Sequence, residues 1–223
     1  NNLEFYIGTH PHSDHIGSAD EIIREFHPKR VYTPAYDDSL IGPSNLLWDN
    51  QYVYDNLITA AEELSIPVIL NLDPSAPLIP AEYGTLGVED LTTTFDIEDN
   101  TPDDPSVSDP SQETGELETD LSGHVGNPCF NLGNFSIEIV NYGTDYQSTS
   151  ANTGNNFSWG VIAEAYGKRA FLGGDIDNTD GDESRLAETV GHVDLIKLNH
   201  HGGGRSNTAP FIDALSPTYS FQT

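Results

Sequence analysis

The fold and the chemistry of this chain are decided by one stretch, Thr9-His10-Pro11-His12-Ser13-Asp14-His15-Ile16-Gly17. The apolar residues 3–7 before it predict a buried strand, and residues 18–21 after it predict the start of a helix. The polar side chains therefore lie on a turn from strand to helix, where short side chains can converge. Imidazole and carboxylate groups bind zinc, manganese and iron once they are deprotonated. The alternating histidines and the Asp-His pair after them thus predict a site for two neighbouring metal ions.

Three later stretches place polar residues at the edges of further predicted strands. Residues 155–158 (Asn-Asn-Phe-Ser) precede one strand, residues 171–175 end another with an aspartate, and residues 194–202 follow a third with paired histidines. Together with the first stretch, they resemble the metallo-β-lactamase superfamily. That resemblance implies an α/β fold, the four-layer αββα sandwich. Residues 198–222 resemble the teichoic-acid phosphorylcholine esterase branch most, with the competence-type DNA-uptake hydrolases next.

The resemblance also implies which residues bind each ion. The first ion takes the two alternating histidines, the second takes the Asp-His pair, and Asp175 bridges the two. One of His200 and His201 completes the second ion. We favour His201, which leaves His200 to contact a phosphate or to donate a proton to the leaving oxygen. The predicted metal ligands are His10, His12, Asp14, His15, Asp175 and His201, and the candidate catalytic residues are Asp14 and His200.

The predicted first ion has fewer protein ligands than in many members of the superfamily. Many members supply a middle histidine, and residues 156–158 stand in its place here. His124 is the alternative, although it lies beside an acidic stretch. The first ion is therefore expected to keep room for solvent or for a phosphate oxygen.

Candidate substrate contacts follow from the chemistry of phosphorylcholine. A phosphate could be held by Arg205 or by backbone N–H groups of the glycines before it, although a flexible turn explains the same residues. A choline headgroup needs aromatic faces, for which Tyr32 and Tyr36 are candidates beside two tryptophans, and packing in the core is the alternative for each. The predicted substrate contacts are Asn156, Ser158, Trp159, Arg205 and Trp48.

Composition restricts the partners of the chain. Eight Lys and Arg against 36 Asp and Glu give a formal net charge of −28, which repels the phosphate backbone of DNA and RNA. We therefore expect no nucleic acid partner, no membrane span and a secreted or cell-surface setting. The single cysteine, Cys129, excludes an internal disulfide and is expected to pack as a small side chain. The chain starts with Asn and lacks Met, so we expect a processed chain or an excised domain, cut at both ends.

Strand and helix patterns alternate along one predicted domain, residues 1–223. Residues 96–120 are acidic, contain proline and no basic residue, and are expected to form a surface insertion in which calcium is a possible ligand. An EF-hand reading of residues 175–182 fails because the sixth position is Asp180 where glycine is needed. Helices are predicted over residues 19–26, 44–64, 183–190 and 207–215, and strands over 3–7, 29–33, 68–72, 135–142, 158–166, 169–173, 193–198 and 218–221.

These patterns predict a two-metal hydrolase, with zinc favoured over manganese or iron. The specific prediction is a phosphodiesterase that releases phosphorylcholine from a cell-wall or related phosphodiester, with a bridging hydroxide attacking phosphorus. A nuclease-like activity is disfavoured by the acidic charge, and a β-lactam-like activity by the absent middle histidine. A non-catalytic module that uses its metals for stability is the alternative from another class.

Overall fold

The computed structural model describes residues 3–78, 125–143 and 153–223. The predicted acidic insertion at 96–120, its possible calcium site and His124 lie outside these residues. Within the described ranges, no helix is both long and apolar enough to cross a membrane. The longest helix, α3 (Asn50–Glu63), has 14 residues.

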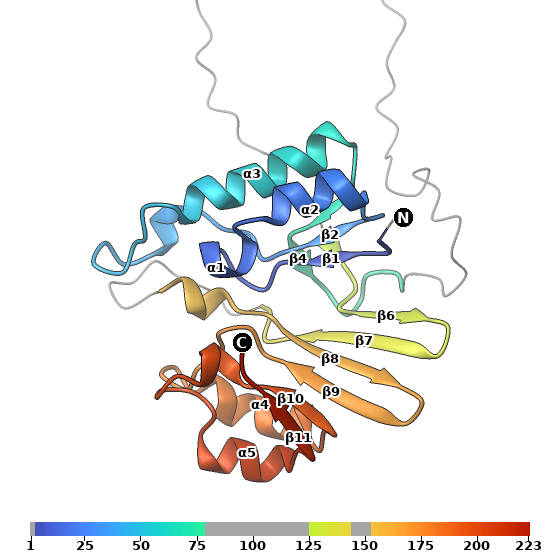
Figure 1. Cartoon of the computed structure of the whole chain (residues 1–223), viewed down its shortest axis with the longest axis vertical. Coiled ribbons are helices and arrows are strands. Elements are labelled where there is room, and N and C mark those ends of the chain that lie inside the picture. The colour runs from blue at the N-terminus through green and yellow to red at the C-terminus, as the bar shows by residue number, and fades with distance from the viewer. Residues whose placement is uncertain (1–2, 79–124, 144–152) are drawn as a thin grey trace, which may run out of the picture.

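The N-terminal half is a small parallel sheet covered by helices. Strands β1 (Tyr6–Ile7), β2 (Val31–Tyr32) and β3 (Val68–Ile69) pair side by side in this order. Helices α2 (Ala19–Phe26) and α3 lie together on the outer face of this sheet, as Figure 1 shows. The strand predicted over residues 68–72 is divided, because its second part, β4 (Asn71–Leu72), pairs with β5 (Val125–Gly126) instead.

The C-terminal half is a six-stranded mixed sheet with its own pair of helices. Strands β6 (Cys129–Leu132), β7 (Phe135–Val140), β8 (Gly160–Ala165) and β9 (Lys168–Leu172) run antiparallel. Strands β10 (Leu195–Lys197) and β11 (Tyr219–Phe221) then continue parallel to β9. Helices α4 (Asp182–Val190) and α5 (Ala209–Leu215) pack together on the outer face of this sheet (Figure 1).

Alternation along the strands of the larger sheet builds two of the three core layers. Val161 and Ile162 are neighbours on β8, so their side chains point to opposite faces of the sheet. Val161 joins the layer between the two sheets, with Ile139 and Trp159, whereas Ile162 joins the layer under α4 and α5. A third apolar layer, which includes Ile23 and Leu57, fills the space between the small sheet and its helices. Three apolar layers separate four structural layers, which confirms the predicted αββα sandwich.

The observed bounds of several elements differ from the predicted ones. Helix α2 spans the predicted residues, but α3 begins at Asn50 and not at residue 44, and Asp49 rather than Ser44 is its N-cap. A short helix that the sequence did not predict, α1 (Ser13–Ile16), lies inside the opening stretch. The predicted hairpin forms from β8 and β9 and turns at Tyr166 and Gly167, both with positive φ.

Candidate metal centre

The predicted ligands lie on loops that leave the carboxyl ends of three strands. The opening histidines follow β1, Asp175 follows β9, and the paired histidines follow β10. A backbone hydrogen bond joins the loops after β9 and β10, because His200 N donates to Gly174 O at 3.1 Å. The loop after β1 is bonded to the segment before β8, where Trp159 N donates to Thr9 O at 2.9 Å. Residues from both sheets therefore converge on one site.

The first group of ligand atoms comes from His10, His12 and Asp175, and these atoms all lie within 4.8 Å of one another. His10 is fully buried, and its Nε2 lies 3.7 Å from Asp175 Oδ2. Backbone packs tightly beside the group, because a Cβ added at Gly154 would overlap His12 Nε2. The geometry brings together the three residues predicted for the first ion.

The second group comes from Asp14, His15 and His201, again within 4.8 Å of one another, and it is more open to solvent. His201 Nε2 lies 3.2 Å from Asp14 Oδ2 and 3.2 Å from His15 Nε2. His15 Nε2 lies 3.7 Å from Asp14 Oδ2. Three ligand atoms thus point toward one small volume.

Asp175 stands between the two groups. Its Oδ2 faces His10, whereas its Oδ1 lies 3.1 Å from His15 Nε2 and 3.6 Å from His201 Nε2. Among the described residues, Asp175 Oδ1 and His10 Nε2 are buried without a hydrogen-bond partner. Buried polar atoms are normally satisfied, and atoms that converge without hydrogen-bonding suit a cation. The donor set therefore fits two metal ions that share one carboxylate.

His200 lies on the side of the first group. Its Nε2 is 3.8 Å from Asp175 Oδ2, and both of its ring nitrogens lie 3.3–3.4 Å from Asn155 Nδ2. About a third of its side chain is exposed, at 35%. The structure thus brings His201, and not His200, to the second group. This separation agrees with the roles that the resemblance implies for the two histidines.

Burial and neighbouring charged groups shift the pKa values of the first ligand group. Burial is the main cause that lowers the pKa of His10 and His12, with the neighbouring His15 and His200 acting in the same direction. For Asp175, burial acts to raise the pKa, but His15, His10 and His200 outweigh it and hold the pKa below its usual range. These shifts favour the deprotonated forms of His10, His12 and Asp175, which are the forms that bind metal.

Lys197 is a buried cation beneath the site. Its Nζ donates to Gly174 O at 3.1 Å and to Leu198 O at 3.2 Å. Burial lowers its pKa, and the carboxylates of Asp175 and Asp14 act against that change. Lys197 thus links the backbone before Asp175 to the backbone before His200.

The five predicted substrate contacts differ in burial and in the residues that they contact. Ser158 is buried, and its Oγ accepts a hydrogen bond from Asp175 N at 3.2 Å, so it holds the aspartate. Asn156 bonds instead to Thr153 and to Asp180, away from the ligand groups. Trp159 is only 3% exposed and packs between the sheets, which leaves no ring face for a ligand.

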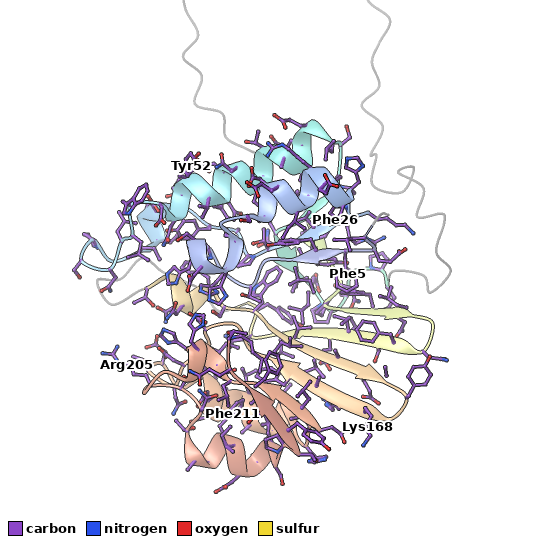
Figure 2. All side chains as sticks on the ribbon, in the orientation of Figure 1. Phe5, Phe26, Tyr52, Lys168, Arg205 and Phe211 are labelled. Atoms are coloured by element: carbon purple, nitrogen blue, oxygen red, sulfur yellow. The ribbon has the colours of Figure 1, made fainter. Side chains whose placement is uncertain are left out.

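The remaining aromatic and basic candidates divide by exposure. Trp48 is 89% exposed on the loop before α3, whereas Tyr32 and Tyr36 are buried in the core. Figure 2 shows Arg205 at the outer edge of its loop, with its side chain directed away from the protein body. Neither Trp48 nor Arg205 has a contact to the two ligand groups that would assign it to the site.

Sequence reasoning missed Asn155, the neighbour of the predicted Asn156. Asn155 Nδ2 contacts His200, and its Oδ1 is buried without a hydrogen-bond partner in the described part of the chain. The available signal was the pair of asparagines itself, since only one of two successive side chains can face the site. Glu183, a fully buried carboxylate of α4, was also missed.

Comparisons with known proteins add little to this geometry. No protein-family model and no curated protein matches the chain. One solved structure, a mutant of CmlA beta-hydroxylase, is similar with a TM-score of 0.47 and 11% identity. That alignment covers 99% of this chain and 36% of the other, so the chain spans about a third of that protein. A likeness this distant carries no argument about activity, and the site has to be interpreted from its own atoms.

Proposed function

We propose that the chain is a metal-dependent hydrolase of the metallo-β-lactamase superfamily with a two-ion centre. The observation that carries this proposal is the position of Asp175, whose two oxygens face different ligand groups. A carboxylate placed in this way can hold two ions at the separation used in two-metal hydrolysis, about 3.5–4 Å. Imidazole and carboxylate donors suit zinc, and they also accept manganese or iron.

The chemistry expected at this site is hydrolysis of a phosphodiester. When bound, the ions supply Lewis acidity and lower the pKa of water. His10 and His12 with Asp175 would hold the first ion, and Asp14, His15 and His201 would hold the second. The hydroxyl of Ser158 accepts a hydrogen bond from the backbone N–H of Asp175, which keeps the shared carboxylate between the two groups.

His200 is proposed as the group that serves the substrate. It is partly exposed, lies beside Asp175 and contacts Asn155, which orients its ring. An imidazole in this position can bind a phosphate oxygen or hand a proton to the leaving alkoxide. Histidine suits the second role because an imidazole can both accept and donate a proton.

The proposed substrate is a phosphorylcholine ester of a cell-wall or related polymer, and a secreted or cell-surface setting goes with it. Support for this finer assignment comes from the resemblance of residues 198–222 and from the net charge of −28, which disfavours nucleic acid. Among the aromatic candidates, Trp48 alone is highly exposed, as a contact to a quaternary ammonium group requires.

Hydrolysis of p-nitrophenylphosphorylcholine and bis-p-nitrophenyl phosphate, with bound metal measured in parallel, tests the proposal. Chelator-sensitive turnover that prefers the choline ester is expected. Turnover of the generic diester alone would show that the substrate needs no choline group. No turnover with two ions bound would favour the non-catalytic module. Asp175→Asn should abolish activity, whereas Asp213→Asn, the same change at an exposed position of α5, should not.

A further inference from the structure

Glu183 is a buried carboxylate that the proposed chemistry does not use. It lies in the first turn of α4 and is fully buried. Burying a carboxylate is costly unless donors satisfy it. Its Oε1 accepts from Asn199 Nδ2 at 3.0 Å and from Asn207 N at 2.5 Å, and its Oε2 accepts from Thr208 N at 2.8 Å. All three donors belong to one loop, residues 199–208, which carries both paired histidines.

The backbone of this loop needs such support. His200 and His201 have φ of 48° and 52°, in the left-handed region that residues with a Cβ avoid. Two successive residues in this region persist only where the surroundings hold them. The loop is closed at its ends, because Asn207 Oδ1 accepts from Asn199 N and Asn207 Nδ2 donates to Asn199 O, each at 2.9 Å. Glu183 then attaches both ends to α4.

Asn199 also connects Glu183 to the strand end that carries Asp175. A Cβ added at Gly173 would overlap Asn199 Oδ1, so the amide fits against bare backbone two residues before the shared carboxylate. His200 N donates to Gly174 O at 3.1 Å in the same region. Asn199, whose amide donates to Glu183, therefore packs directly against the strand end that leads to Asp175.

We propose that Glu183 is a positioning residue: it fixes the loop so that His201 stays in the second ligand group and His200 stays beside Asp175. This inference rests on the proposed metal centre. It predicts an asymmetry, because the first group takes His10 and His12 from a different loop. Loss of Glu183 should weaken the second ion and leave the first ion bound.

The test compares Glu183→Gln with Leu186→Ala. Glutamine keeps the size of the side chain but turns an NH₂ group toward donors that need an acceptor. Leu186 lies on the same helix and is buried in the apolar layer under α4 and α5, so its truncation destabilises the fold without removing a bond to the loop. Zinc affinity is titrated for each site by competition with a chromogenic chelator. For Glu183→Gln we expect an approximately 10- to 100-fold loss at the second site and wild-type affinity at the first.

Hydrogen exchange of the metal-free proteins gives a readout that does not depend on the ions. The amides of Asn207 and Thr208 donate directly to Glu183, and they should exchange at least about tenfold faster in Glu183→Gln than in Leu186→Ala. Equal effects of the two variants on both sites and on exchange would overturn the positioning role. If the wild-type chain binds no ions, the proposed function fails, while exchange still decides the role of Glu183. Should Glu183→Gln not fold, Asn199→Ala, which removes one of the three donors, is measured in the same way.

Discussion

Gly154→Ala is the sharpest test of the first ligand group. The added methyl would overlap the imidazole of His12, closest at Nε2, and His12 belongs to the first ligand group. Restoring van der Waals contact requires the imidazole to move by roughly 1 Å or more, which exceeds the tolerance of a metal ligand, about 0.2 Å. We therefore expect the first ion to be bound about 100-fold more weakly, or about 2.7 kcal/mol. The second group does not involve His12 and should keep its affinity.

Site-resolved titration with zinc or cobalt, with the Co²⁺ absorption spectrum as a second readout, measures this change. Gly204→Ala is the matched control, because a Cβ there meets no atom within 4 Å although the residue lies on the loop of the paired histidines. Two ions bound with wild-type affinity in Gly154→Ala would refute the assignment of His12. Equal losses in the two variants would show that any added methyl near the site perturbs it.

Three further predictions follow from the geometry. Burial lowers the pKa of His10 and His12, so the metal-free native chain binds fewer protons than the unfolded chain below about pH 6.5. Its free energy of unfolding, measured by denaturant titration, should therefore fall as the pH drops from 7.5 to 5.5. Replacing His200 by Ala should lower kcat by about 10²- to 10⁴-fold with both ions bound, whereas His201→Ala should release the second ion; metal analysis beside kinetics separates them. Ser158→Ala removes the acceptor for the buried Asp175 N–H and should cost about 1–3 kcal/mol in thermal unfolding, and a neutral result would contradict that contact.

The long-range architecture was predictable because its signals are local and repeated. Helix α2 has a complete amphipathic period, and its predicted and observed limits coincide. The predicted start of α3 is too early, because Leu47 continues the apolar spacing of the helix although it is exposed on the preceding loop. Hydrophobic spacing alone does not reveal on which side of the N-cap a residue lies.

The opening stretch indicates a metal site by its own residues, because the turn after a strand brings short polar side chains together. Asp175 and His201 were assigned to that site only through the resemblance. The contacts that surround the ligand groups could not be predicted from the sequence. Asn155 and Asn156 are chemically identical neighbours, and only the turn of the chain decides that the first faces His200. Glu183 bonds to residues 16 to 25 positions away, through contacts that no local pattern encodes. Trp159 was a candidate because a choline headgroup needs an aromatic face, but packing between the sheets determines its place.

The shared position of Asp175 has a mechanical consequence. The opening histidines are attached to the small sheet, whereas Asp175 and His201 are attached to the large one, as the arrangement of strands in Figure 1 makes clear. Ions bound between these residues would cross-link the two halves of the sandwich, in addition to the apolar layer that joins the halves. Removing the ions would then weaken the interface between the halves before either half unfolds. The thermal stability of this protein and its catalysis would therefore depend on the same few atoms.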